Sequence, residues 1–365
     1  MLKSPSETLT LSKIYDIPPE DILFLDFSLV GVKLNFFYPR VRFEFIPENK
    51  SYFKTSFQRA IKKYFFALPT NSTSNYYIKD RYLMRGNERF GRIKNLANDT
   101  CDTSYPRRNG TVLNLNPVPK SSCHGCQFCH TLLQGANDRQ EDLRSVSGVK
   151  NFIEKWLRKN KVLDLSHLIQ VAVVTGCFGG EEKVIEYLQK LDNILSKYSF
   201  DGELFYYGSE ITTKESFDRL KKIKHFAVCL SLECFENREK LVRDIKAKIT
   251  IDKAKEILKI AKESGFRTNF SYILGLESIE IIEKRFKELF PYINSFPVIN
   301  IFQVHRSQEK LRYSEAWKLD YYMKVRKIIE DLFKNTEMRP RVWENYRSLW
   351  YLNFAGEELT DIRTP

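Results

Sequence analysis

The sequence predicts an α/β fold, a partial or complete (β/α) barrel with an N-terminal α+β extension. From residue 111 onward, short apolar, β-branched runs alternate with amphipathic stretches, which is typical of βαβ units and a parallel sheet. Six or seven such units fit a barrel better than a short doubly wound sheet. A polar, turn-rich stretch over 98–110 precedes the series. We therefore predict an extension over 1–105, a barrel over 106–340 and a C-terminal tail over 341–365 that packs on the barrel.

The predicted extension is basic and has strand signals of its own. Residues 1–110 hold 18 Lys and Arg against 11 Asp and Glu, an excess of +7 within a net charge of +13. A solvated surface is the ordinary interpretation and an anionic partner the alternative; we expect this block to define the substrate. Segment 52–66 interleaves basic and aromatic residues as a nucleic-acid surface does, but its aromatics also have the spacing of a core-facing helix. Alternation over 41–45 predicts a strand.

The chain has the features of a cytoplasmic protein. It contains no apolar run long enough to cross a membrane, and residues 1–8 do not resemble a secretory signal, so we expect no membrane partner. Thiols stay reduced in the cytosol, so the seven cysteines favour metal or redox chemistry over disulfides.

The elements predicted after residue 110 follow one another in regular order. The strands are predicted over 111–115, 168–175, 204–207, 226–232, 268–274 and 298–304. The clearest helices are predicted over 182–198, 214–223 and 251–264, the last one ending at Gly265.

Three cysteines follow the first of these strands. Cys123, Cys126 and Cys129 lie within seven residues, and three thiolates on one loop can bind a single soft metal centre. Only three ligands are offered locally, which would leave one iron of a [4Fe–4S] cluster open to a substrate or cofactor.

Other metal sites fit this segment less well. A haem-attachment site would require export, and a bacterial ferredoxin run would need a cysteine where Leu133 stands. A structural zinc site normally has a second ligand pair, although His124 or His130 could supply a fourth ligand.

With this cluster and the strand series together, residues 111–310 resemble the radical S-adenosylmethionine (SAM) superfamily, in particular the branch of biotin synthase and the iron-only hydrogenase maturase. The segment from Cys126 through Phe128 to Cys129 matches the family's C-x-aromatic-C, while two residues instead of the usual three separate Cys123 from Cys126. The resemblance implies a barrel of radical SAM type whose three cysteines hold a [4Fe–4S] cluster, with SAM chelating the fourth iron. A reductant such as flavodoxin or ferredoxin would supply one electron, and the resulting 5′-deoxyadenosyl radical would abstract hydrogen from a small molecule, peptide or nucleic acid.

The resemblance also implies SAM contacts at the carboxyl ends of the strands, where parallel α/β barrels bind ligands. In chain order these are Phe128, Thr175, Gly176, Glu181, Gly208, Ser209, Glu210, Ser231, Glu233, Ile273 and Gly275. Relatives place an arginine for the SAM carboxylate at the position of Ala254. The flanking Lys253 and Lys255 are the candidates here, each as a point charge and not a bidentate fork.

Residues near two further strand ends complete the candidate site. Gln303, His305 and Arg306 follow the last predicted strand and are candidate substrate contacts. Cys177 and Cys234 are candidate catalytic residues, as radical quenchers, sulfur donors or ligands of a second cluster; the alternative is that they are small buried thiols. A different class of function fits the same features: a non-catalytic, zinc- or cluster-stabilised protein whose basic extension binds nucleic acid.

Overall fold

The structure is a computed structural model that describes residues 5–35, 38–99, 104–118, 125–129, 143–174 and 178–361. The chain divides into two compact units. The first unit comprises Met1–Thr100, Ile273–Glu288 and Val298–Pro365, and the second comprises Cys101–Tyr272 and Leu289–Pro297. The first unit is thus assembled from both ends of the chain.

The first unit contains a five-stranded antiparallel sheet of order β2-β1-β5-β4-β3. Its elements are α1 (Pro5–Tyr15), α2 (Pro19–Val30), β1 (Arg40–Pro47), α3 (Lys54–Gln58), β2 (Tyr64–Pro69), β3 (Tyr76–Lys79), β4 (Tyr82–Arg85), β5 (Glu88–Asn98), α10 (Ile279–Leu289), β12 (Val298–Ile301), η4 (Arg306–Leu311), η5 (Ser314–Trp317), α11 (Leu319–Phe333), η6 (Val342–Glu344), β13 (Asn353–Phe354) and β14 (Glu357–Glu358).

Helix α2 lies in the core of the first unit and packs against this sheet. It is buried on all sides from Glu20 to Val30, and because this stretch includes Glu20, Asp21 and Asp26, its carboxylates need partners inside the protein. Its Phe24 and Phe27 rings lie 6.2 Å from the ring of Phe45 on β1, both in edge-to-face geometry. The strand predicted over 41–45 is confirmed as β1.

Segment 52–66 does not form the single helix that its aromatic spacing suggested. It holds the short helix α3 and the first residues of β2, with Ala60 between them in a left-handed conformation (φ 51°). Tyr52, Phe53, Tyr64 and Phe66 are nevertheless buried, so these four aromatics belong to the core and are not a nucleic-acid surface.

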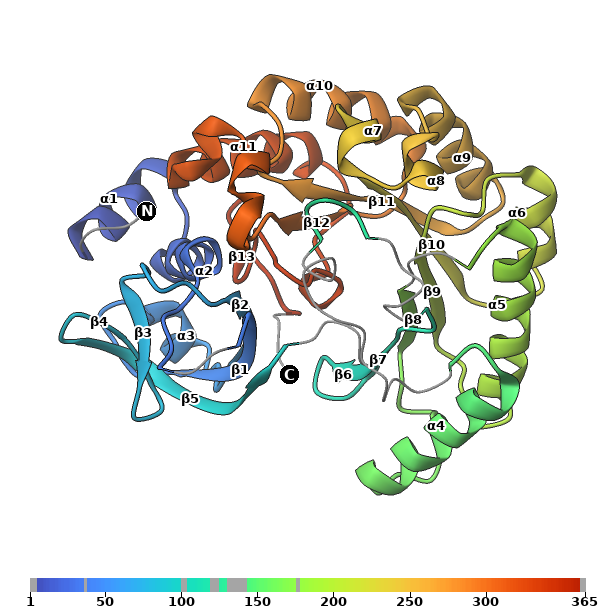
Figure 1. Ribbon diagram of the computed structural model, residues 1–365, viewed down its shortest axis with the longest axis horizontal. Helices are drawn as coiled ribbons and strands as arrows, with labels where there is room; N and C mark the ends of the chain where they lie inside the picture. The colour runs from blue at the N-terminus through green and yellow to red at the C-terminus, as the bar shows by residue number, and fades with distance from the viewer. Residues whose placement is uncertain are drawn as a thin grey trace. The chain divides into compact units, whose positions relative to one another are not determined.

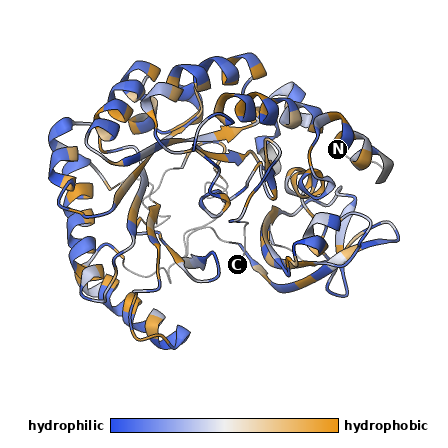
Figure 2. Cartoon of the chain, turned by 180° about the vertical axis from the view of Figure 1, so that it is seen from behind, coloured by the Kyte–Doolittle hydropathy of each residue, from blue (hydrophilic) through white to orange (hydrophobic). Residues whose placement is uncertain are grey.

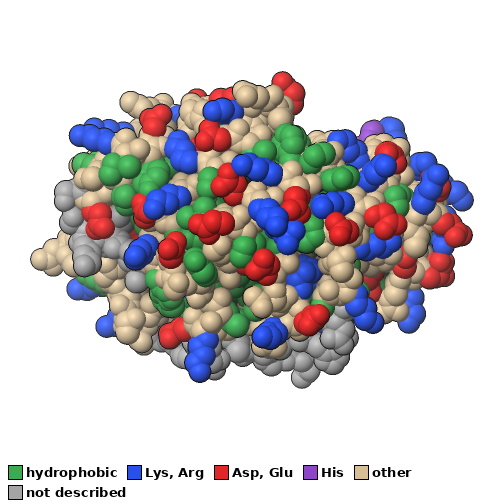
Figure 3. Space-filling view, turned by 90° about the horizontal axis from the view of Figure 1, so that it is seen from above, with side chains coloured by type: hydrophobic (Ala, Val, Ile, Leu, Met, Phe, Trp, Pro, Cys, Tyr) green, Lys and Arg blue, Asp and Glu red, His purple; other side chains and the backbone are tan. Residues whose placement is uncertain are grey.

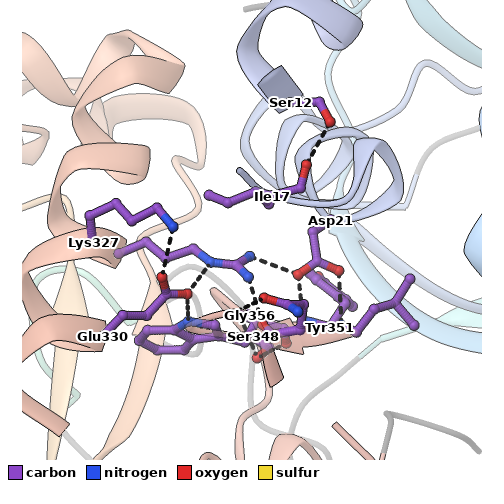
Figure 4. A network of polar contacts seen from close by, with 12 residues as sticks. Ser12, Ile17, Asp21, Lys327, Glu330, Ser348, Tyr351 and Gly356 are labelled. Atoms are coloured by element: carbon purple, nitrogen blue, oxygen red, sulfur yellow. Dashed lines mark hydrogen bonds and ion pairs between the residues drawn. The ribbon is translucent and has the colours of Figure 1, made fainter. Parts of the chain in front are cut away.

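A buried ion network joins the two ends of the chain inside the first unit (Figure 4). Arg326 on α11 donates to Asp21 of α2 at 2.7 Å and to Glu330 at 2.8 Å, and all three side chains are buried. Glu330 also accepts from the indole N–H of Trp350 at 3.0 Å, and Asp21 accepts from the backbone N–H of Leu352 at 2.8 Å. Each charge therefore has partners, which a buried charge requires.

The second unit is built on a curved sheet covered by helices on its outer side (Figure 1). Its elements are β6 (Tyr105–Arg107), β7 (Val112–Leu115), α4 (Val146–Asn160), β8 (Gln170–Val174), α5 (Glu181–Ser196), β9 (Glu203–Gly208), α6 (Lys214–Leu220), β10 (Phe226–Glu233), α7 (Arg238–Leu241), α8 (Asp244–Ala247), α9 (Ile251–Glu263), β11 (Arg267–Leu274) and η3 (Phe290–Tyr292). Helix α5 packs between α4 and α6, and α6 packs on α9.

The sheet confirms the predicted α/β class and corrects the alternative of a complete barrel. Its order is β12-β11-β10-β9-β8-β7-β6, with β7 to β11 parallel and β6 antiparallel to β7. Seven strands with an edge at either end form a partial barrel and not the closed eight-stranded TIM barrel. Each predicted strand is present, although the one expected over 298–304 already ends at Ile301. The polar, turn-rich stretch 98–110 includes strand β6.

The two faces of this sheet differ in chemistry, because side chains alternate along a strand. One face carries apolar residues such as Val228, Leu230 and Leu232 on β10, and hydrophobic residues continue along the strands (Figure 2). The other face carries Phe205 and Val174 but is mostly polar: Gln170, Glu203, Tyr207, Cys229, Ser231, Glu233, Asn269 and Ser271. We refer to this second face as the polar face. A buried face with so many polar groups is expected where a ligand binds.

Surface charges on the helices are mixed in sign. Figure 3 shows one side of the molecule, on which basic and acidic side chains are interspersed. Several are helical pairs such as Lys287–Glu283 and Lys324–Asp320. Among the residues that the structure describes, no helix combines the length and apolarity needed to cross a membrane.

Candidate metal centre

Two of the three motif cysteines lie on one tight turn in the second unit. The Cys129 N–H donates to the Cys126 carbonyl at 2.8 Å, and Gly125 before them has φ +64°, a conformation that favours glycine. Cys126 is buried and Cys129 half-buried. The turn is attached to α7 and α8: Gln127 N–H donates to the Leu241 carbonyl at 2.9 Å, and Arg243 N–H donates to the Cys126 sulfur. Cys123 lies outside the described residues.

A buried ion pair lies beside this turn at the carboxyl end of β10. Lys246 Nζ on α8 is 3.1 Å from Glu233 Oε1 and donates to Ser231 Oγ at 2.6 Å, while Ser231 donates to Glu233 at 2.6 Å. Burial alone would raise the pKa of Glu233, but Lys246 and the hydroxyl of Ser231 hold it below its ordinary value. Burial opposes the charge on Lys246 as well, but Glu233 and the neighbouring thiols raise its pKa. The lysine and the carboxylate are therefore both charged at neutral pH.

The backbone at Glu233 is strained. Glu233 has φ +71°, which is uncommon for a residue with a side chain, and the Cys234 N–H donates back to the Leu232 carbonyl at 2.9 Å. This is a γ-turn with positive φ, a rare and strained conformation that turns the Glu233 carboxylate toward Ser231 and Lys246. Such strain is often found at functional sites, where surrounding contacts maintain it.

A buried arginine holds this strained turn against α8. Arg238 donates to the carbonyls of Leu232, at 2.7 Å, and of Cys234, on either side of Glu233. It also donates to the carbonyl of Lys246. The guanidinium thus fixes the distance between the end of β10 and the segment that carries the lysine.

The polar face continues from Glu233 across three strands. Tyr207 on β9 donates to Glu233 at 3.3 Å, and Tyr207 and Asn269 lie in register with Cys229 on either side of β10. Burial and the charge of Glu233 raise the pKa of Tyr207 well above its ordinary value, so its hydroxyl stays protonated. At the amino end of the same face, Arg267 closes the sheet with a bidentate contact to Glu203, both bonds at 2.7 Å.

The described thiols fit a soft metal centre. Burial raises the pKa of Cys126 to about 11; Lys246 opposes this shift and Glu233 adds to it. Without metal the thiol is therefore neutral at pH 7, and metal binding would release its proton. Thiolate ligands suit iron–sulfur clusters or zinc, and the Lys246 cation would offset part of their negative charge. Within the described part of the chain no group of three or more ligating side chains is assembled, since Cys123 falls outside it.

Two carboxylates predicted to contact SAM accept hydrogen bonds from backbone amides, each from the loop that carries the other. Glu210, after β9, accepts from the N–H groups of Phe178 at 2.9 Å and of Gly179 and Gly180 at 3.0 Å, all three after β8. Glu181, at the start of α5, accepts from Thr212 N–H at 2.8 Å and Thr213 N–H at 3.0 Å, both after β9. The loops after β8 and β9 are thus joined by an exchange of carboxylates, and Glu210 occupies the anion-binding nest that the glycines form.

The other predicted SAM contacts are distributed over both units. Phe128, Gly208 and Ser209 are buried in the second unit, whereas Ile273 and Gly275 belong to the first. Thr175 and Gly176 lie outside the described residues, as does the catalytic candidate Cys177. Cys234 and Cys229 are both buried.

The two lysines proposed for the SAM carboxylate lie on the surface of α9. Lys253 pairs with Glu256 at 3.0 Å and Lys255 with Asp252 at 3.2 Å, while Ala254 between them is buried. Lys246, which the sequence analysis did not select, is the cation next to Cys126. The sequence has several lysines between 240 and 262 and no signal that separates this one from the others.

Two of the predicted substrate contacts meet a buried arginine of the N-terminal block within the first unit. Arg40 donates to Gln303 at 2.7 Å and contacts His305 Nε2 at 3.0 Å, and its Nε donates to Asp99 at 3.0 Å. Because arginine only donates, His305 Nε2 accepts here and the proton lies on Nδ1. The side chain of Arg306 is outside the described part. These contacts position Gln303 and His305, and their role toward a substrate stays a prediction.

The ion pair between Arg40 and Asp99 predicts a pH-dependent stability. Burial would raise the pKa of Asp99, but Arg40 and the hydroxyl of Tyr346 lower it below its ordinary value. Asp99 therefore adds stability above its unfolded pKa of about 3.9, and this is lost as the pH falls through the lower folded value. We expect Asp99→Asn to lower the free energy of unfolding by about 3 kcal/mol at pH 7 and by progressively less below about pH 4. Urea denaturation of wild type and variant at several pH values measures this difference. A difference in unfolding free energy that does not change with pH would contradict this prediction. The control is Asp218→Asn, at an exposed ion pair, which should have little effect on stability at any pH.

Comparison with known proteins finds partial structural matches. No protein-family model matches the chain, and no curated protein is similar in sequence. Streptococcus suis SuiB bound to S-adenosylmethionine matches with a TM-score of 0.44 and 14% identity, over 64% of this chain and 49% of that chain. The Escherichia coli coproporphyrinogen III oxidase HemN, a radical SAM enzyme, matches with a TM-score of 0.43 and 15% identity, over 62% and 53%. The radical SAM methyltransferase TsrM of Kitasatospora setae, with cobalamin and a [4Fe–4S] cluster bound, matches with a TM-score of 0.37 and 12% identity, over 52% and 36%. The chain thus spans about half or less of the length of these proteins.

Proposed function

We propose that this chain is a radical SAM enzyme, with Cys123, Cys126 and Cys129 as ligands of a [4Fe–4S] cluster. The observation that carries the proposal is the buried pair of Lys246 and Glu233, which lies beside Cys126 at the carboxyl end of β10. SAM has an ammonium, a carboxylate and a ribose within one small molecule, so a site for it needs a fixed cation and a fixed anion close together. When bound, the cluster supplies the electron that cleaves SAM into methionine and the radical that abstracts hydrogen.

The residues of the chain would bind and orient the cofactor. The Lys246 ammonium has three N–H donors, of which two are used by Ser231 and Glu233, and the third is available for the SAM carboxylate. Glu233, held by the strained turn, would accept from the SAM ammonium or ribose hydroxyls. Tyr207 keeps its proton, which it donates to Glu233. Residues Lys246 and Glu233 are buried from water, which strengthens each of these contacts.

The proposal assigns SAM cleavage and hydrogen abstraction and leaves the substrate class undefined. The reductant, a flavodoxin or ferredoxin by resemblance, is part of the proposal, as is a cytoplasmic location. The alternative of a zinc-stabilised nucleic-acid-binding protein has less support, because four of the aromatics that suggested such a surface are buried in the core.

The test is reconstitution of the protein with iron and sulfide under anaerobic conditions, followed by dithionite and SAM. We expect a brown protein that forms 5′-deoxyadenosine, and no product from Cys126→Ala. The matched control is Cys101→Ala, which removes a cysteine of the polar stretch 98–110 that is not part of the motif; it should retain the cluster and the product. A colourless protein that takes up zinc and does not bind SAM would overturn the proposal.

A further inference from the structure

A buried arginine in the first unit lacks a carboxylate partner. Arg312, just after η4, is 7% exposed, and the structure gives its guanidinium one hydrogen bond, from a terminal NH₂ to the Phe302 carbonyl at 3.0 Å. Its Nε is buried without a hydrogen-bond partner. No ion pair with Arg312 occurs among the described residues, although the exposed Glu309 of η4 interacts with it electrostatically over a longer distance. Burial lowers the pKa of this guanidinium, although it remains protonated at neutral pH.

The other buried arginines of the first unit are paired. Arg40 contacts Asp99, Arg85 contacts Glu88, and Arg326 contacts both Asp21 and Glu330. A buried charge without a counter-ion destabilises the folded protein, because its lost hydration is not replaced. Arg312 is the exception to this pattern, and its charge is explained if an anion from outside the chain completes it.

Neighbouring groups have the chemistry of an anion site. Arg312 lies over the ring of Trp317, with Cζ 4.5 Å from the ring centroid, and Trp317 is 40% exposed, so this side of the cluster borders the protein surface. Tyr322 is close enough for its hydroxyl to interact electrostatically with Arg312. That hydroxyl is fully buried and also has no hydrogen-bond partner. The arginine N–H groups and the tyrosine O–H are hydrogen-bond donors, and an oxyanion can accept from both.

The position in the fold supports the same conclusion. Phe302 follows β12 directly and Gly275 follows β11 directly, so the cluster lies at the carboxyl end of these strands, where α/β sheets bind ligands. Gly275 has φ +115°, and a Cβ on it would lie 3.0 Å from the Tyr322 hydroxyl. A side chain at this position would therefore crowd the hydroxyl.

We propose that Arg312 and Tyr322 bind the oxyanion group, carboxylate or phosphate, of a small-molecule ligand. The inference does not depend on the radical SAM proposal, because it requires neither the cluster nor any residue of the second unit. It adds a class of ligand that the cysteine motif does not imply.

The test is thermal denaturation of the full chain in sodium chloride, acetate and phosphate at equal ionic strength. We expect phosphate or acetate to raise the melting temperature of the wild type relative to chloride, and the more effective anion indicates the ligand class. Arg312→Met should melt at a higher temperature than the wild type in chloride, because the unpaired charge is gone, and should lose the anion-dependent shift. Tyr322→Phe should keep its stability in chloride and bind the anion about tenfold more weakly.

The matched control is Arg219→Met, which removes an exposed arginine paired with Glu182 and should leave the anion shift unchanged. If Arg312→Met melts at a lower temperature than the wild type in chloride or does not fold, Arg312 has a structural role and the proposal is overturned. It is also overturned if the variant retains the wild-type anion shift, or if neither anion stabilises the wild type.

Discussion

Replacing Lys246 with methionine should lower the rate of 5′-deoxyadenosine formation about 100-fold in the reconstituted protein, or about 2.7 kcal/mol in transition-state stabilisation. The variant loses the cation proposed for the SAM carboxylate and leaves the Glu233 carboxylate buried without its ion-pair partner. The pKa of Glu233 should then rise, because burial is no longer offset by a nearby positive charge. The measurement is single-turnover product formation with excess dithionite and SAM.

Two matched controls separate this prediction from a general effect of losing a lysine. Lys253→Met and Lys255→Met remove the cations that the family resemblance suggested, and both lie on the surface of α9 in pairs with acidic neighbours. We expect their rates to stay close to that of the wild type. If either control loses activity while Lys246→Met retains it, the assignment from resemblance is correct and the assignment from the structure is wrong.

Replacing Arg326 with methionine should reduce the free energy of unfolding by about 3–5 kcal/mol. The variant leaves two buried carboxylates, Asp21 and Glu330, without the guanidinium that lies 2.7 Å and 2.8 Å from them. The effect should be large because α2, α11 and the segment around Trp350 all make hydrogen bonds to this network. Urea denaturation of wild type and variant measures it.

A triple variant tests whether unpaired charge is the cause. Arg326→Met combined with Asp21→Asn and Glu330→Gln removes the buried charges together, and we expect it to recover most of the lost stability. Arg219→Met, at an exposed ion pair, is the control and should change the stability little. A single variant as stable as the control would show that the network contributes no more than a surface pair.

The parts of the fold that follow from side-chain periodicity could be predicted. The parallel strands read as continuous apolar runs bounded by turns, and strands β8 to β11 appear close to their expected positions. Segment 52–66 could not be assigned in the same way, because spacing alone does not show that the chain turns at Ala60 and enters β2. The assembly of the first unit from both ends of the chain depends on contacts such as Asp21 with Arg326, which have no local signal.

The candidate site shows the same limit. The cysteine loop was evident from spacing, but Lys246 is in a four-residue helix with no pattern that distinguishes it from neighbouring lysines. Arg238 and the left-handed backbone of Glu233 were equally hidden, since both depend on how the end of β10 meets α7 and α8. Glu181 and Glu210 were predicted as ligand contacts because acidic residues at strand ends often are, and their role toward SAM stays a prediction. Which backbone groups a carboxylate satisfies is decided by loop geometry that the sequence does not display.

The exchanged carboxylates of Glu181 and Glu210 bear on how this edge of the sheet opens. The carboxylate of each loop accepts hydrogen bonds from backbone N–H groups of the other loop. If the loops separate, N–H groups in both of them lose their acceptors at the same time. The two loops should therefore behave as a single cooperative unit, with the amide hydrogens of Gly179 and Thr212 exchanging with solvent in the same event although more than thirty residues separate them. A ligand that displaces one of these loops to reach the polar face would therefore displace the other loop as well.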